Sequence, residues 1–204
     1  MNILDKLERK YGFLSFPNLY MYMTVIFLIG LIMNLFNPMF YYYYLSLNPQ
    51  MILKGEIWRL FTFVFYPPTS SISILLSLLM IYVYYSITKT LTLIWRPFKF
   101  NLYMFIGYIS QIIGAFIVYF IMKRSIIMYP TYTFFSIIMA CALTFPDATF
   151  YIYFLIPIKA KYFAYFELAV YALIFISSGL PDRVAIICSV VNVYIFFVLL
   201  KNKI

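Results

Sequence analysis

The stretch that decides the fold is residues 19–36, LYMYMTVIFLIGLIMNLF, which carries no charged side chain. A helix that crosses the hydrocarbon core of a bilayer needs about 20 mostly apolar residues. Further stretches of this kind follow at 69–87, 102–122, 126–145, 162–180 and 184–200. Backbone polar groups must be paired within the membrane, and a helix achieves this by itself. We therefore predict an all-α polytopic membrane protein with a bundle of six transmembrane helices.

Composition supports a membrane location. Hydrophobic residues make up 66% of the chain and charged residues 10%, and the mean hydropathy is +0.95. Soluble domains contain roughly 45–50% apolar and about 25% charged residues. The net charge of +9 would favour nucleic acid in a soluble protein, but here the cations lie between apolar runs. The expected partner is therefore the lipid bilayer and not nucleic acid.

The regions between the spans differ in character. Residues 1–18 mix charged and apolar side chains and are interpreted as an amphipathic lead-in. Residues 37–68 are neither polar nor a clean span, and they contain the run Tyr41–Tyr44. Because Tyr and Trp favour the headgroup level, we expect an interfacial segment there. The economical division is a lead-in at 1–18 and a single membrane domain over 19–204.

Lys and Arg counts in the connections predict the orientation, because cytoplasmic loops are enriched in these residues. With the N-terminus inside, the cytoplasmic segments hold ten cations and the outer segments hold five. Both termini are therefore predicted to be cytoplasmic. The predicted outer cations are Lys54, Arg59, Lys123, Arg124 and Arg183.

Two motifs resemble the rhomboid superfamily, whose core is six transmembrane helices. Gly55-Glu56-Ile57-Trp58-Arg59, with Thr62 and Phe65 after it, is similar to the G-x-x-W-R-x-x-T-x-x-F pattern of rhomboid proteins. Asn48-Pro49 with Ile57–Leu60 is similar to a stretch of the related derlins. The resemblance implies that this loop dips into the membrane and perturbs lipid packing.

The second motif joins the fourth and fifth predicted spans. Phe145-Pro146-Asp147, followed by Pro157 and the basic pair Lys159 and Lys161, resembles the helix four to five connection of bacterial rhomboids. This motif favours a bacterial plasma membrane, whereas a derlin-like protein would lie in the endoplasmic reticulum.

The catalytic positions of the resemblance are degenerate. A serine nucleophile needs a base such as histidine to accept its proton, and the chain contains no histidine. The nucleophile position falls near Thr131 and the base position at Ser189. A Ser–Lys arrangement would need a lysine within reach, and the cations all lie in predicted loops or ends, where we expect them to be solvated. The resemblance therefore implies a catalytically inactive member, a pseudoprotease.

No cofactor or metal site is expected, because histidine and C-x-x-C motifs are absent from the sequence. Cys141 and Cys188 both lie in apolar segments and are interpreted as small buried hydrophobes.

Glu167 is the one acidic residue inside a predicted span, about 9 Å along the helix from Lys161. Intramembrane carboxylates are costly and indicate function. The structural alternative is a hydrogen bond to a neighbouring helix or a pair with a loop lysine. Either way we expect Glu167 to face protein and not lipid. Trp58 and Arg59 suit the interface, with the guanidinium on phosphate or on Glu56.

Other polar residues in the spans have a packing interpretation. Ser110, Gln111, Ser189 and Asn192 are expected to form hydrogen bonds between helices. Gly107 and Gly114 are two turns apart on one helix face, which allows close approach of another helix.

The expected function is binding of transmembrane segments of client membrane proteins. The alternative is a small transporter, channel or lipid-handling protein, which should show repeated or broken helices and several intramembrane ionisable groups. An unconventional intramembrane serine protease ranks third.

Overall fold

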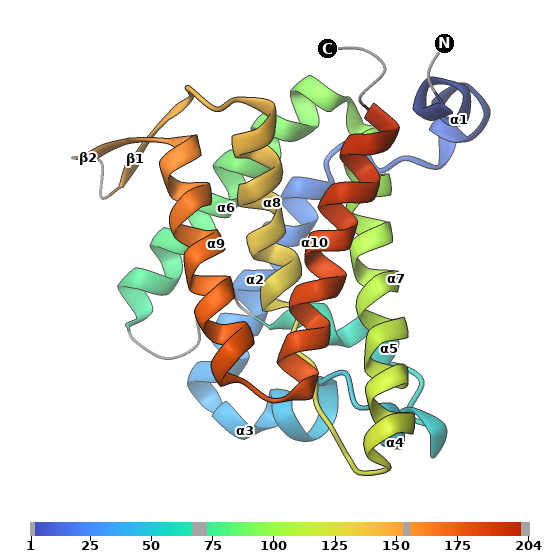
Figure 1. Cartoon of the computed structure of the whole chain (residues 1–204). Helices are drawn as coiled ribbons and strands as arrows, with labels where there is room; N and C mark the ends of the chain where they lie inside the picture. The colour runs from blue at the N-terminus through green and yellow to red at the C-terminus, as the bar shows by residue number, and fades with distance from the viewer. Residues whose placement is uncertain (1–2, 67–72, 153–155, 201–204) are drawn as a thin grey trace.

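The structure is a computed structural model that describes residues 3–66, 73–152 and 156–200. It is a helical bundle with one short hairpin, and the helices run up and down between two ends (Figure 1). The main helices are α2 (Leu19–Phe36), α6 (Ile74–Trp95), α7 (Pro97–Met122), α8 (Thr131–Thr144), α9 (Ala160–Ser177) and α10 (Leu180–Leu200).

Five of these helices, all except α8, are long and apolar enough to cross a membrane. The structure is thus compatible with a protein that crosses a membrane several times. With 14 residues, α8 is only about 21 Å long at ~1.5 Å per residue, short of the roughly 30 Å hydrocarbon core. Nine of its residues are buried, and it packs against α6, α7, α9 and α10. The apolar side chains of α8 are therefore buried in the core of the bundle.

The predicted boundaries hold for the first span and shift for others. Helix α2 matches 19–36. Helix α6 ends at Trp95 instead of residue 87, so Lys89 lies on a helix and not in a loop. Helix α7 begins at Pro97 instead of residue 102. The corner between them is Arg96, which has φ +70°. The predicted start at 69 and Pro67-Pro68 lie outside the described residues, as do Lys201 and Lys203.

The fourth predicted span also begins too early. Residues 126–130 are not helical, because Met128 bridges Leu47 in the interfacial segment and Pro130 precedes α8. Helix α9 begins at Ala160 and ends at Ser177, and α10 begins at Leu180 instead of residue 184.

The smaller elements lie at the two ends. The lead-in forms α1 (Ile3–Tyr11) and the 3₁₀ turn η1 (Gly12–Leu14). The interfacial segment folds into short helices instead of one extended loop. They are α3 (Pro38–Phe40), the π-helical η2 (Tyr41–Leu45), α4 (Pro49–Leu53), α5 (Arg59–Thr62) and η3 (Phe63–Phe65). An antiparallel hairpin, β1 (Thr149–Ile152) and β2 (Ile156–Lys159), joins α8 to α9.

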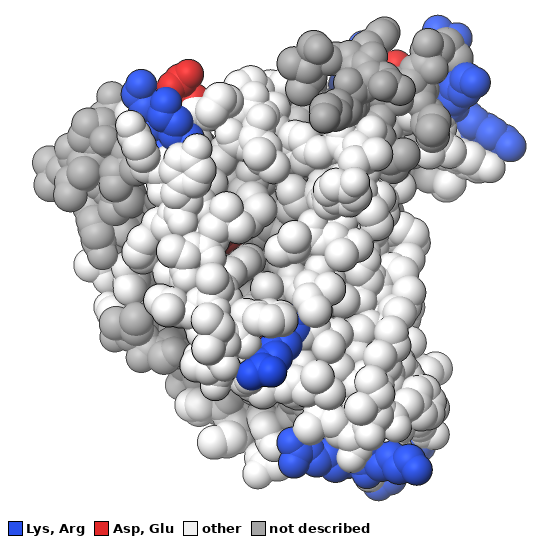
Figure 2. All heavy atoms as spheres, viewed as in Figure 1, with Lys and Arg blue, Asp and Glu red and all other residues white. Residues whose placement is uncertain are grey.

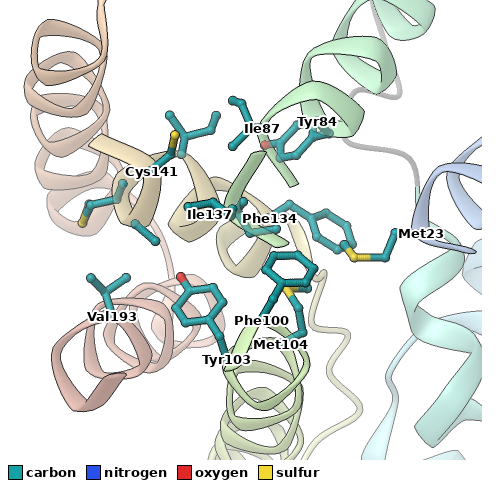
Figure 3. Packing of buried hydrophobic residues seen from close by; sticks show 14 of the residues in the cluster. Met23, Tyr84, Ile87, Phe100, Tyr103, Met104, Phe134, Ile137, Cys141 and Val193 are labelled. Carbon is teal, nitrogen blue, oxygen red and sulfur yellow. The ribbon is translucent and has the colours of Figure 1, made fainter. Parts of the chain in front are cut away.

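The main core gathers aromatic and aliphatic side chains from several helices around α8 (Figure 3). Phe134 of α8 makes edge contacts with the rings of Phe27 and Tyr84, at centroid distances of 4.7 and 6.3 Å. Tyr84 from α6 and Tyr103 from α7 both direct their rings into this core (Figure 3). Such edge-to-face pairs stabilise beyond area burial by about 0.5–1.5 kcal/mol each.

Most of the charged side chains visible in this view lie toward the two ends of the molecule, and the surface between them is mainly uncharged (Figure 2). The end with α1 and the C-terminal part of α10 also holds the α6–α7 corner and the hairpin (Figure 1). Of the cations predicted to be cytoplasmic, those on α1, at the α6–α7 corner, and in β2 and the start of α9 belong to this end. Which end faces the cytoplasm stays a prediction.

Candidate functional site

The inner face of α7 is more polar than its outer face. Tyr103, Gly107, Gln111 and Gly114 recur at helical spacing, and all four are buried. The opposite face carries Phe105, Ile113 and Phe120, which are 62, 55 and 62% exposed. An apolar exterior around a polar interior suits a helix that faces lipid on one side and protein on the other.

The two glycines allow α10 and α8 to approach α7 closely. A Cβ atom at Gly107 would lie 2.8 Å from Asn192 Nδ2 and 3.0 Å from Thr133 Cγ2. A Cβ atom at Gly114 would lie 2.8 Å from Cys188 Sγ. The predicted packing role of both glycines is confirmed, and Gly107 is the point where α7, α8 and α10 meet.

One hydrogen bond near this point joins α7 to α8, and a second lies within α8. Ser136 Oγ donates its single proton to the Thr133 carbonyl at 2.6 Å. The Tyr103 hydroxyl, 2.7 Å from Ser136 Oγ, must therefore be the donor in the bond that joins α7 to α8. The Asn192 amide lies close to the same hydroxyl group.

Several polar atoms in this region have no hydrogen bond of good geometry within the described residues. They include both amide atoms of Gln111 and of Asn192, and the Thr133 hydroxyl. All three residues have zero exposure. A buried polar group without a partner costs roughly 1–3 kcal/mol, so this region holds hydrogen-bonding capacity that the described fold does not use.

Glu167 adds a carboxyl group from α9. It is 6% exposed, which confirms that it faces protein. Neither structural alternative for Glu167 is seen among the described residues, where the carboxyl group forms no pair with a loop lysine and neither of its oxygens makes a hydrogen bond of good geometry. Tyr171 lies one turn away, but its only hydroxyl proton is donated to the Tyr132 carbonyl at 3.1 Å.

We call these buried polar side chains of α7 to α10 the polar seam. Its members are Tyr103, Gln111, Thr133, Ser136, Glu167, Ser189 and Asn192. Thr131, the predicted nucleophile position, is the half-buried first residue of α8 and lies outside the seam. Ser189, the predicted base position, is buried and donates to the Ile186 carbonyl at 2.8 Å. The pair that the fold brings against Gly107 is instead Thr133 and Asn192.

Arg59 is the centre of the interfacial segment, and the expectation that every cation is solvated is wrong for it. Its side chain is 3% exposed. It donates to Glu56 Oε2 at 2.6 Å, to the Ser46 carbonyl at 3.1 Å and to the Tyr43 carbonyl. The last two acceptors lie in the last turn of η2 and at its C-cap, where backbone carbonyls lack helical partners and favour a cation.

The rest of the Trp–Arg motif supports this arrangement. Trp58 is 48% exposed and donates its indole N–H to the Tyr44 carbonyl at 3.1 Å. Gly55 has φ +108°, a conformation that other residues rarely adopt. Ile57 and Phe61 are 63 and 77% exposed. The segment thus presents apolar side chains on its surface, and the hydrogen bonds of buried Arg59 connect its parts.

The α8–α9 connection brings its motif residues together. Asp147 accepts hydrogen bonds from Lys161 at 3.1 Å and from Lys159 at 3.4 Å. The Lys161 N–H donates to the Pro146 carbonyl, next to half-buried Phe145. Pro157 pairs with Tyr151 in the hairpin. These contacts connect the end of α8 with the start of α9 and lie outside the polar seam.

Sequence reasoning singled out Gln111, Ser189, Asn192 and Glu167 but missed Tyr103, Thr133 and Ser136. A signal was present, because Thr133, Ser136 and Ala140 follow helical spacing with small or polar side chains. Metal binding has no visible basis in the described ranges, where no group of three His, Cys, Asp or Glu side chains is close enough to hold an ion.

No family model, curated protein or solved structure matches the chain. The resemblance to rhomboid proteins therefore rests on the sequence motifs alone.

Proposed function

We propose that the chain is a non-catalytic, rhomboid-like membrane protein that binds transmembrane segments of other membrane proteins through the polar seam. The observation that carries the proposal is the set of buried polar atoms on Gln111, Thr133, Asn192 and Glu167 that make no hydrogen bond of good geometry in the described chain. Within a bilayer, such groups are stabilised by polar side chains or by locally unwound backbone of another helix.

A client segment could reach the polar seam if α9 moved away from its neighbouring helices. Helix α9 packs on α8 and α10, and one of its contact clusters with α8 consists of Ala142, Ala160 and Ala164. Because alanine buries little area, separating the helices at this cluster costs less than separating leucine or phenylalanine contacts. A modest outward movement of α9, which carries Glu167, would open the seam toward lipid.

The non-catalytic part of the proposal rests on the missing base. Thr133 and Ser136 supply hydroxyl groups, but the sequence has no histidine to accept a proton. A serine-hydrolase probe that labels the purified protein would contradict this part.

Site-specific photo-crosslinking in native membranes tests client binding. A benzophenone amino acid replaces Tyr132, which is half-buried beside Thr133. The matched control replaces Tyr194, an exposed tyrosine of α10. We expect defined membrane proteins to be captured from position 132 and not from 194, and a polar transmembrane peptide to compete better than a polyleucine peptide. Capture of lipid alone at both positions would contradict the proposal.

A small transporter or channel is the second candidate, favoured by Glu167, a buried carboxyl group within a spanning helix. Reconstituted vesicles that take up a small ion or solute, with uptake lost in Glu167→Gln, would support this alternative over client binding.

A further inference from the structure

An apolar groove lies between the lead-in and the first half of α7, separate from the polar seam. Its volume is about 430 Å³, within the range of roughly 300–1,000 Å³ typical of ligand pockets. Leu14, Phe16 and Leu19 line it on one side, and Leu102, Phe105 and Tyr108 line it on the other. These side chains suit a hydrocarbon ligand.

Polar contacts hold the lead-in against the bundle. Asp5 Oδ1 pairs with Lys99 at 2.9 Å, and Glu8 lies 3.9 Å from Lys99 and 3.7 Å from Arg96. Beyond α1, Asn101 Nδ2 donates to the Phe16 carbonyl at 3.1 Å. The chain is therefore anchored at α1 and again at Phe16, and Leu14 and Ser15 between these anchors line the groove.

Helix α1 has an acidic side and a basic side. The acidic residues face the bundle, whereas Lys6, Arg9 and Lys10 are exposed. Lys10 lies over the ring of Tyr11, 5.2 Å from its centroid, and Tyr11 lines the groove. Figure 2 shows basic side chains on the part of the molecule that projects at the upper right, above a concave outline. Exposed positive charge is thus placed beside an apolar groove.

We propose that this groove binds an acyl chain of an anionic phospholipid, with the lipid phosphate held by Arg9 and Lys10. The apolar lining fits the chain, and the exposed cations fit the phosphate. Each Lys or Arg near an anionic membrane surface strengthens binding roughly fivefold. The bound lipid would fix the lead-in against α7 at the membrane surface. This inference does not depend on client binding at the polar seam.

Native mass spectrometry of the full-length protein with added phosphatidylglycerol or phosphatidylcholine tests the site. With two cations, we expect phosphatidylglycerol to be retained at concentrations about 25-fold lower than phosphatidylcholine. The double change Arg9→Gln and Lys10→Gln should remove this preference, whereas Lys123→Gln with Arg124→Gln, an exposed pair at the other end of α7, should keep it.

Groove-filling variants test the acyl-chain part. Leu102→Trp fills the groove from α7, and Leu14→Trp fills it from a side chain that is 63% exposed, where folding tolerates the change. Retention of phosphatidylglycerol should fall at least fivefold in whichever of them folds. Equal retention of both lipids by the unmodified protein would overturn the proposal, as would a preference that survives the Arg9 and Lys10 changes.

Discussion

Replacing Arg59 by leucine is expected to destabilise the fold more than any other single charge removal in the described chain. The guanidinium donates to Glu56, to the Ser46 carbonyl and to the Tyr43 carbonyl. Arg59→Leu would leave these acceptors beside a buried apolar side chain. Breaking a buried ion pair by removing one partner costs about 3–5 kcal/mol.

The lower part of that range applies here, because the Glu56 side chain is 32% exposed and can regain water. We therefore expect a loss of about 3 kcal/mol, a large share of the roughly 5–15 kcal/mol that stabilises a typical fold. The assay is equilibrium unfolding in mixed micelles with increasing denaturing detergent, followed by far-ultraviolet circular dichroism.

Two variants make the result interpretable. Arg59→Lys keeps the charge but loses the planar fork, so its stability should lie between those of Arg59→Leu and the unmodified protein. Arg124→Leu removes an exposed arginine near the same end and should change stability by less than about 0.5 kcal/mol. An Arg59→Leu protein as stable as Arg124→Leu would refute the role given to Arg59.

Further predictions concern the helix interfaces, the buried acid and the hairpin. Gly107→Ala should cost about 1–3 kcal/mol by overpacking against Asn192 and Thr133, whereas Gly12→Ala, whose Cβ would meet only Glu8 Cγ at 3.9 Å, should be nearly neutral in the same unfolding assay. Glu167→Leu should keep or raise stability and reduce client crosslinking from position 132. If folding, abundance and client crosslinking were all unchanged, Glu167 would have no functional role. Hydrogen bonds from Lys161 and Lys159, and their positive charge, lower the pKa of Asp147 below its usual value. Its stabilising contribution is therefore present above the pKa of a free aspartate and is lost as the pH falls through the lower folded value; carbon-13 NMR of the Asp147 carboxyl group checks this shift, and Lys161→Gln should move the pKa upward.

Hydropathy predicted a helix well where the apolar stretch and the helix have the same ends. Residues 19–36 form α2 as expected. The fourth span was placed too early because Ile126 and Met128 are apolar for another reason. They are buried with Leu47 and Phe63 of the interfacial segment, and hydropathy does not separate burial in protein from burial in lipid.

The second span shows the opposite error. The last two turns of α6 carry Thr88, Lys89, Thr90 and Thr92, which lower the local hydropathy although the helix continues. Thr88 and Thr92 donate to carbonyls one turn earlier, at 2.6 and 2.7 Å. Their hydroxyl groups are thus hydrogen-bonded within the helix. The polar residues therefore did not indicate the end of α6.

The site was predictable in part. Because a carboxylate is too costly in lipid, the inward orientation of Glu167 followed from its position in an apolar span. The meeting of Thr133 and Asn192 at Gly107 depends on how three helices cross, which no local pattern specifies. The burial of Arg59 depends likewise on carbonyl groups more than a dozen residues earlier in the chain.

The most direct test of the central claim compares stability with capture in a variant that carries both Thr133→Val and Asn192→Leu. Both changes remove polar groups that make no hydrogen bond of good geometry within the described chain, so we expect their replacement by apolar groups to be nearly neutral or stabilising. If the polar seam is a binding site, this variant should unfold at the same or higher detergent concentration and should lose client crosslinking from position 132. A variant that is destabilised by several kcal/mol, or that is equally stable and still captures the same clients, would contradict the account.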